Sequence, residues 1–315
     1  MHLPKDKIKI AVLLSSYNGE RFIEEQISSL LNLYSKYDID IHIRDDGSAD
    51  GTKKIIKEIT KKNSNIFLYE GCNVGVINSF LWLVEHVRGY EYYAFCDQDD
   101  VWEPLKIIAA VNMIENNNRK IPLIYCSAYS YVDHNLGFIG RFESQSDFSI
   151  QNLLIENCAP GCTMVFNSLL REKYCNLNLK HISQRIVMHD WFFLLLGLGF
   201  GKVLYDKNSY LLYRQHANNV IGKKSGFYNI IKSKIKQFIK ESKRPKHLLY
   251  LQAKLLAECC IEIPDGEIHR LSNLFVVSQN SLLSRIKFVL GGNIKRVKRI
   301  DDAIFKILFI FGYYR

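Results

Sequence analysis

The segment YYAFCDQDD, residues 92–100, gives the clearest indication of the fold. Five residues suited to a buried strand, Tyr92 to Cys96, run directly into Asp97, Asp99 and Asp100. An apolar strand that ends in polar residues is typical of an α/β sheet, in which ligands bind outside the carboxyl ends of parallel strands. The flanking sequence must then supply further strands and the helices that connect them.

The flanking sequence does contain such elements. Short β-rich segments predict strands at 7–16, 39–44, 65–69 and 123–132. Apolar residues at helical spacing predict helices at 19–37, 53–62, 76–87 and 105–115. We therefore expect an α/β fold with a mostly parallel sheet flanked by helices, followed by a helical C-terminal region.

Composition excludes several classes of protein. The chain has 315 residues, of which 48% are hydrophobic and 23% charged, so it can fold around a sizeable core. Its apolar segments are shorter than the roughly 18–20 residues of a membrane helix, and we expect a cytoplasmic protein without a signal peptide. Its eight cysteines form no CxxC pair, so we expect them to be reduced.

Charge divides the chain near Gly222. Residues 1–222 have a net charge of −2, whereas residues 223–315 hold 19 Lys and Arg against 7 Asp and Glu, a net charge of +12. We expect a catalytic domain at 1–222 and a basic helical tail at 223–315, with one further strand considered at 274–277. Basic residues alternate with bulky aliphatic ones at helical spacing in 227–239, which favours an anionic membrane surface. The alternative is a packed helical subdomain, and no nucleic-acid-binding module is present.

Polar segments follow the first four predicted strands, at 15–19, 45–52, 71–75 and 97–100. We expect them to meet at one rim of the sheet. If the strand geometry continued past Cys96, Asp97 and Asp99 would lie on the same face and could share one cation. Hard oxygen ligands favour Mg²⁺ or Mn²⁺. The alternative is a solvated acidic loop that caps the helix beginning at Pro104.

The sequence lacks the motifs of several other kinds of binding and catalytic site. The segment 46–57 begins like a calcium loop but has Lys57 where a bidentate glutamate is required. The sequence contains no GxxxxGK[ST], GxGxxG, HExxH or GxSxG motif, which argues against P-loop, dinucleotide-binding, zincin and serine hydrolase sites.

The ordered set of rim motifs resembles the inverting family 2 glycosyltransferases with the A-type fold, over residues 8–220. Its carriers are LSSYNG at 14–19, DDGSADGT at 45–52, NVG at 73–75 and DQDDVWEP at 97–104. Three further motifs are similar to the bacterial rhamnosyltransferase-like branch: PGCTMVFN at 160–167, MHDW at 188–191 and YRQH at 213–216.

The resemblance implies a role for each matched residue. The donor-binding residues would be Ser15, Tyr17, Asp46, Asn73, Asp97 and Arg214. The metal ligands would be Asp97, Asp99 and His216, with Mn²⁺ or Mg²⁺ bridging the donor diphosphate. For Arg214 a phosphate contact competes with pairing to an acid, and for His216 metal ligation or a diphosphate contact competes with an ordinary loop histidine.

The resemblance also implies the catalytic base, Asp190, which would deprotonate the acceptor hydroxyl. The alternative for Asp190 is capping of the apolar helix that it precedes. We expect a metal-dependent inverting transferase that moves L-rhamnose, as first choice, from dTDP-L-rhamnose to a saccharide acceptor. That acceptor would be lipid-linked and part of a cell-surface polysaccharide, with the enzyme peripheral on the inner face of the bacterial plasma membrane.

Alternatives to this activity remain. One is a hexosyl- or N-acetylhexosaminyltransferase that uses a UDP-sugar. Two others belong to different classes, a sugar nucleotidyltransferase and a non-catalytic scaffold.

Overall fold

The computed structural model describes residues 7–34, 36–177, 182–215, 247–261 and 266–314. The described residues fall into two compact units. The first contains residues 7–34, 36–144, 159–177 and 188–214, and the second contains 145–158, 182–187, 215, 247–261 and 266–314. The boundary expected near Gly222 lies outside the described residues. No sequence feature had suggested that two earlier segments join the second unit.

The first half of the first unit is a parallel sheet with helical connections. Its strands are β1 (Lys9–Ser16), β2 (Asp38–Asp45), β3 (Ile66–Glu70) and β4 (Tyr92–Cys96), and its helices are α1 (Ile23–Leu31), α2 (Thr52–Thr60) and α3 (Val76–His86). β1 pairs in parallel with both β2 and β4, and β2 pairs in parallel with β3. Ile10 to Leu14 of β1 are fully buried, as expected for a strand covered on both faces.

The second half makes the sheet mixed. It adds β5 (Val101–Trp102), β6 (Leu123–Val132), β7 (Phe138–Phe142), β8 (Val165–Asn167) and β9 (Lys202–Arg214). Among the described residues the strand order is β3-β2-β1-β4-β8-β6-β9-β5, with β7 paired to β6. β6 pairs in parallel with β9, whereas β8 is antiparallel to β4 and β6, β7 is antiparallel to β6, and β5 is antiparallel to β9. The mostly parallel sheet flanked by helices that we expected is confirmed, with short antiparallel strands added to it.

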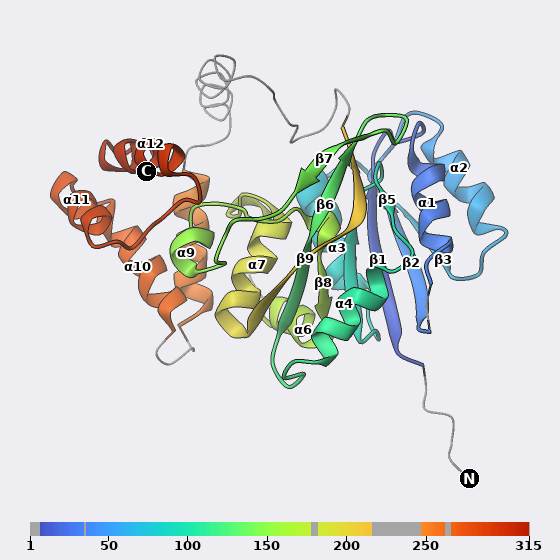
Figure 1. Ribbon diagram of the computed structural model, residues 1–315, viewed down its shortest axis with the longest axis horizontal. Helices are drawn as coiled ribbons and strands as arrows, with labels where there is room; N and C mark the ends of the chain where they lie inside the picture. The colour runs from blue at the N-terminus through green and yellow to red at the C-terminus, as the bar shows by residue number, and fades with distance from the viewer. Residues whose placement is uncertain (1–6, 35, 178–181, 216–246, 262–265, 315) are drawn as a thin grey trace, which may run out of the picture. The chain divides into compact units, whose positions relative to one another are not determined.

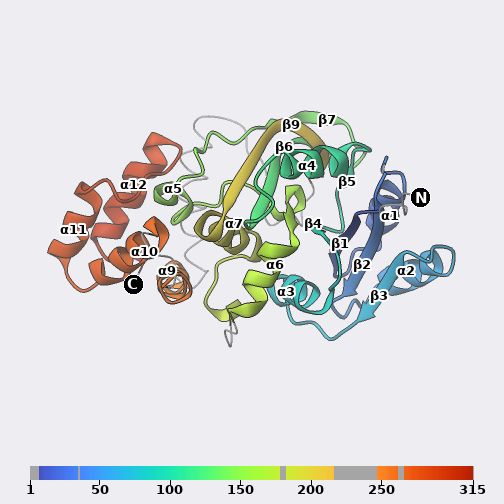
Figure 2. The ribbon, with the colours of Figure 1, turned by 90° about the horizontal axis from the view of Figure 1, so that it is seen from below.

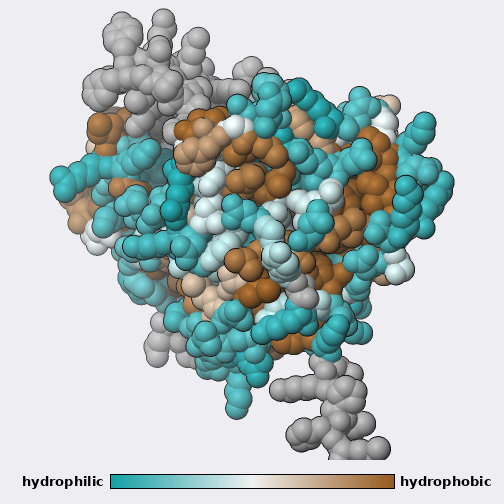
Figure 3. Space-filling model, turned by 45° about the vertical axis from the view of Figure 1, so that its right-hand side comes forward, coloured by the Kyte–Doolittle hydropathy of each residue, from teal (hydrophilic) through white to brown (hydrophobic). Residues whose placement is uncertain are grey.

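Helices cover both faces of this sheet (Figures 1 and 2). One face packs against α1, α2 and α4 (Lys106–Glu115), whose apolar residues Ile23, Ile56 and Ile107 join one core with alternate residues of β1. The other face packs against α3, α6 (Ser168–Asn176) and α7 (His189–Phe200). In the view of Figure 3, hydrophobic residues lie in several separate patches among polar ones.

The second unit is helical. It contains α5 (Ile150–Leu153), the short 3-10 helix η2 (Ile182–Gln184), α9 (Leu248–Cys259), α10 (Glu267–Ser278), α11 (Leu282–Leu290) and α12 (Arg299–Ile310). The strand considered at 274–277 is wrong, because these residues lie within α10. Phe275, Phe288 and Phe309 pack with ring centroids 5.0–5.9 Å apart and join α10, α11 and α12 around a common core.

The cysteines and the apolar helices are the two remaining features for which the sequence made a prediction. None of the eight cysteines is in a disulfide, and five of them are buried. No described helix is both long enough and apolar enough to cross a bilayer.

Candidate functional site

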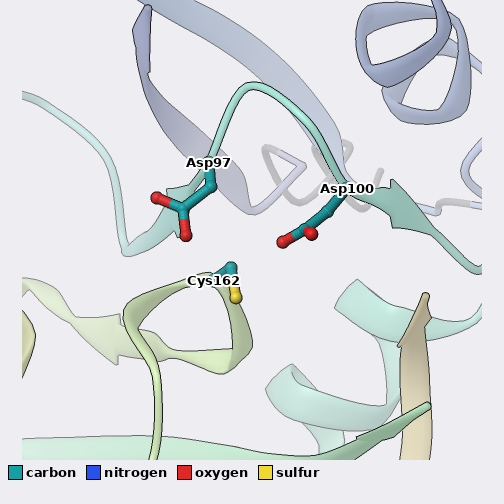
Figure 4. Close-up of side chains that lie close together, drawn as sticks. All are labelled: Asp97, Asp100 and Cys162. Carbon is teal, nitrogen blue, oxygen red and sulfur yellow. The ribbon is translucent and has the colours of Figure 1, made fainter. Parts of the chain in front are cut away.

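The acidic loop, residues 97–100, begins where β4 ends at Cys96. The chain bends at Gln98 and Asp99, so the strand geometry that would have placed Asp97 and Asp99 on one face does not continue. Instead, one carboxylate oxygen of Asp97, one of Asp100 and the sulfur of Cys162 lie within 4.8 Å of one another. Figure 4 shows the Asp97 and Asp100 side chains pointing from the two ends of the loop into the same space.

Crowding and burial perturb these carboxyl groups. Burial, and then the charges of Asp99 and Asp190, raise the pKa of Asp97 to about 7. Burial, and then the charges of Asp99 and Asp97, raise the pKa of Asp100 well above its ordinary value. A cation among these oxygens would relieve the repulsion that adds to the effect of burial. The carboxylates of Asp97 and Asp100, with Asp99 close by, fit a divalent metal ion that prefers oxygen ligands. Burial raises the pKa of the Cys162 thiol well above its ordinary value, so Cys162 stays a neutral thiol and does not act as a ligand.

A buried lysine lies beneath this cluster. Lys106, the first residue of α4, is fully buried, and its Nζ donates a hydrogen bond to the carbonyl oxygen of Cys162 at 2.8 Å. The ammonium also lies 4.5 Å from the centroid of the Trp102 ring. Burial lowers the pKa of Lys106 to about 8, although the nearby Cys162, Cys96 and Asp100 oppose that shift. Sequence reasoning gave Lys106 no role in the site.

Arg214, at the end of β9, holds the acidic loop from the other side. Its backbone N–H donates to Asp100 Oδ1 at 3.1 Å, and its Nε donates to the carbonyl of Asp99 at 2.9 Å. Nη1 donates to the carbonyl of His134 at 2.7 Å, and Nη2 pairs with the carboxylate of Glu25 in α1. Only 1% of Arg214 is exposed. The ion pair with Glu25 is one of the two alternatives left by the sequence, and the phosphate contact stays a prediction.

Asp190 lies in the first turn of α7, whose N-cap is Met188, so the expected alternative of N-capping does not describe it. Its Oδ2 accepts a hydrogen bond from the backbone N–H of Gly161 at 3.0 Å, and its Oδ1 accepts one from the N–H of Trp191 at 2.6 Å. Because its charge raises the pKa of Asp97, Asp190 is a neighbour of the acidic loop. The structure thus brings together the two carboxylates to which different roles were assigned.

The expected donor residues lie on the loops after β1, β2 and β3. Tyr17 is 46% exposed and Asn73 is also exposed, whereas the hydroxyl of Ser15 donates to that of Ser79 at 2.6 Å. Asp46 is buried, and its carboxylate pairs with Arg44. The carboxylate also accepts hydrogen bonds from the backbone N–H groups of Val74 and Gly75, each at 2.9 Å.

These loops are joined to one another and to the acidic loop. The side-chain amide of Gln98 accepts from the backbone N–H of Tyr17 at 2.8 Å and donates to its carbonyl at 3.1 Å. The side chain of Asn18 links to the loop after β2 by accepting from the N–H of Ala49 at 2.9 Å. Gly47 has φ +81°, and a Cβ there would lie 2.9 Å from the backbone nitrogen of Asn73, so this approach of two loops requires glycine. The expected residues therefore share one rim.

One expected site residue lies outside the described part of the chain, and several residues near the site were not foreseen. His216, the expected third metal ligand, lies outside the described residues. The structure adds Gly161 and Cys162, which belong to the short 3-10 helix η1 (Gly161–Thr163), together with Lys106 and Glu25. The PGCT motif at 160–163 was the available signal for the first two, but it carried no assigned role.

Comparisons with known proteins identify the family of this chain. The model of the family described as Glycosyl transferase family 2 matches residues 11–174. RfbG from Shigella flexneri, a dTDP-rhamnosyl transferase, is 32% identical over 222 residues, which cover 68% of this chain and 75% of that protein. WfgD from Escherichia coli, a UDP-Glc:alpha-D-GlcNAc-diphosphoundecaprenol beta-1,3-glucosyltransferase, is 27% identical over 161 residues, or 51% of this chain and 60% of that one.

A solved structure shares the fold. Residues 1–349 of TarS from S. aureus, in complex with UDP, align with a TM-score of 0.55 at 16% identity, covering 91% of this chain and 89% of that one. The family match spans more than half of the chain, and the match to RfbG spans more than two thirds of it. The chain therefore belongs to glycosyl transferase family 2, and it is a glycosyltransferase.

Proposed function

We propose that this glycosyltransferase moves a sugar, L-rhamnose as first choice, from a nucleoside diphosphate to a saccharide hydroxyl with inversion. The observation that carries the proposal is the position of Asp190 beside the acidic loop, where its charge raises the pKa of Asp97. One carboxylate group is thereby available for the donor diphosphate and its metal, and another for the acceptor. The similarity to RfbG supports dTDP-L-rhamnose as the donor.

The donor would occupy the rim formed by the loops after β1 to β4. We place base and ribose against Ser15, Tyr17, Asp46 and Asn73. Tyr17 and Asn73 are exposed and could contact a ligand directly. Asp46 fixes the backbone at 74–75, so its loss should disorder the base site as well as remove a contact.

The acidic loop would hold Mn²⁺ or Mg²⁺. We assign Asp97 and Asp99 as ligands, with His216 as a third, and Asp100 belongs to the same cluster of carboxylates. When bound, the cation would stabilise the negative charge that develops on the departing diphosphate. The residues of the chain supply its position, because Arg214 holds the backbone of Asp99 and the carboxylate of Asp100.

Asp190 would act as the general base. In an inverting transfer the acceptor hydroxyl attacks the anomeric carbon from the face opposite the leaving group, and it must lose its proton during attack. A carboxylate within about 3 Å of that hydroxyl is sufficient. The backbone N–H groups of Gly161 and Trp191 donate hydrogen bonds to the carboxylate of Asp190 and keep it in one orientation.

The test is a donor panel followed by two variants. Purified protein is titrated with dTDP-L-rhamnose, UDP-glucose, UDP-N-acetylglucosamine and GDP-mannose, with and without Mn²⁺, and binding is followed by calorimetry. We expect the tightest metal-dependent binding for dTDP-L-rhamnose. Preference for a UDP-sugar would instead identify a hexosyl- or N-acetylhexosaminyltransferase, the alternative that WfgD illustrates. Family membership favours a transferase over a sugar nucleotidyltransferase or a scaffold.

The two variants separate the assigned roles. Asp99→Asn should weaken metal-dependent donor binding, whereas Asp190→Asn should leave it unchanged and lower turnover by about 10²-fold or more. Donor binding that collapses in Asp190→Asn would make this residue structural. Asp100→Asn is the comparison that shows which carboxylates of the loop hold the metal.

We also propose that the helical unit binds an anionic membrane surface, which would place the enzyme peripherally beside a lipid-linked acceptor on the inner face of the bacterial plasma membrane. Ile300, Ile307 and Phe311 are 65%, 55% and 79% exposed and recur at helical spacing along α12 and its end, next to the exposed residues Lys298 and Arg299. Residues 223–315 have a net charge of +12. An apolar stripe beside basic residues suits the surface of an anionic bilayer.

Vesicle co-sedimentation tests this proposal. Binding to phosphatidylglycerol vesicles should exceed binding to phosphatidylcholine vesicles and should weaken as salt is raised. Replacing Ile300, Ile307 and Phe311 by serine should remove the part of the binding that resists salt. The matched control replaces Leu283 and Leu290, exposed residues of α11, by serine. Equal binding to both kinds of vesicle would contradict the electrostatic part of the proposal.

A further inference from the structure

Lys106 has a place in the site that the assigned roles do not use. Its ammonium group is fully buried, and a buried charge carries a large desolvation penalty unless its surroundings compensate it. The compensation comes from the carbonyl oxygen of Cys162, the face of Trp102 and the nearby carboxylate of Asp100. The lysine therefore contacts a specific turn of the chain, 56 residues away in sequence.

That turn leads to Asp190. Cys162 is the central residue of η1, and the preceding residue, Gly161, donates its N–H to Asp190 Oδ2 at 3.0 Å. The turn is held within itself, because Thr163 donates to the carbonyl of Pro160 from both its N–H, at 3.1 Å, and its hydroxyl, at 2.8 Å. A turn that is rigid in this way transmits the position of the Cys162 carbonyl to the adjacent Gly161 amide.

The fit around Asp190 is close. A Cβ built on Gly161 would lie 3.1 Å from the Cβ of Asp190, so the turn and α7 are in contact and a shift of one displaces the other. A misplacement of about 1 Å in a reacting group can cost about 10²-fold in rate. A variant that loses the anchor of the turn should accordingly have a lower kcat.

We propose that Lys106 is a positioning residue for the general base: by holding the Cys162 carbonyl, it fixes the turn whose Gly161 amide orients Asp190. The inference depends on the proposed function, because it takes Asp190 as the base. The hydrogen bond of Lys106 goes to the turn and not to the loops after β1, β2 and β3, and Asp100 is the residue of the acidic loop whose charge acts on it. Its loss should thus lower kcat by more than it changes the donor KM.

The experiment is a double-mutant cycle on the full chain. Lys106→Met keeps the length of the side chain but removes the charge and the hydrogen bond, and we expect kcat to fall by at least about tenfold with a donor KM within about twofold. In the Asp190→Asn background the same change should have little further effect, because two residues that act as a unit are not additive. Lys57→Met, at a surface lysine paired with Glu70, is the control for the substitution itself.

The outcomes are distinguishable. Wild-type kcat in Lys106→Met, or an equal fall of kcat in both backgrounds, would overturn the inference while leaving the proposed function intact. Wild-type turnover in Asp190→Asn would overturn the proposed function itself. If Lys106→Met does not fold, Lys106→Gln replaces it, since it retains an N–H donor on a neutral side chain. It should lose less kcat than Lys106→Ala, and equal losses would refute a role through the hydrogen bond.

Discussion

Gly161→Ala is the sharpest test of how Asp190 is held. Gly161 is buried in η1, and an added Cβ would lie 3.1 Å from Asp190 Cβ and 3.2 Å from His189 Nε2. Such contacts are shorter than ordinary van der Waals separations, so α7 or the turn must move by a few tenths of an ångström. Overpacking of this kind costs about 1–3 kcal/mol of folding stability.

The same movement predicts the kinetic effect. If a displacement of about 1 Å costs about 10²-fold, a few tenths of that distance should lower kcat about tenfold or less. The donor rim is untouched by the new methyl group, and nucleotide affinity should stay at its wild-type value. Steady-state kinetics gives kcat and the donor KM, calorimetry gives the affinity, and urea unfolding gives the loss of stability.

Gly89→Ala is the matched control. Gly89 has φ +88° with open space around its Cβ position, so alanine there is strained by about 1–2 kcal/mol without pressing on a neighbour. This variant should lose stability but keep wild-type kcat. The reasoning is refuted if Gly161→Ala is destabilised yet turns over at the wild-type rate, or if both variants lose kcat equally.

Three further outcomes are expected. Chelation by EDTA should abolish metal-dependent transfer and Mn²⁺ or Mg²⁺ should restore it, whereas full activity in EDTA would remove the metal from the mechanism. Burial lowers the pKa of His42 to about 4 from 6.5, against the opposing charge of Asp40, so the unfolded chain alone takes up this proton as pH falls from about 6.5 to about 4. Binding of this proton should lower the free energy of unfolding by up to about 3 kcal/mol over that range. In His42→Gln, urea unfolding at several pH values should give a free energy of unfolding that depends less on pH, and an unchanged pH dependence would argue against this role of His42. Phe309→Ala should destabilise the helical unit by about 3–5 kcal/mol in thermal unfolding and spare donor binding, and an unaltered midpoint would contradict the packing described for α12.

The first half of the fold could be predicted because its signals are local. The strand 92–96 has the observed bounds, and the helices predicted at 53–62 and 76–87 correspond to α2 and α3. In the second half, the strand predicted at 123–132 corresponds to β6, whereas β5, β7, β8 and β9 were not predicted. β8 is only three residues long, and β9 contains the polar residues 206–209, so both are recognised only through pairing with distant strands.

In the site, too, the features with local sequence signals could be predicted, and those that depend on contacts between distant residues could not. The apolar strand β4 followed by three carboxylates predicted an acidic rim. The expected placement of Asp97 and Asp99 on one face required the strand to continue past Cys96, where β4 ends. Lys106 and Gly161 could not be assigned from their neighbours in sequence, because their roles come from contacts across 56 and 29 positions. The partner of Arg214 is Glu25, 189 positions away, and no sequence period connects them.

Because Arg214 binds the acidic loop, the loop can reach its final conformation during synthesis only after Arg214 has been added to the chain. Arg214 follows Asp99 by 115 positions, and β9 follows its edge partner β5 by a similar distance. A ribosome that adds about 5–20 residues per second needs roughly 6–23 s to cover that interval. A nascent chain therefore displays four charged or polar residues after β4 for many seconds before the strand that ties them down exists. Donor-competent protein should appear only after β9 has left the exit tunnel, however early the parallel strands have folded.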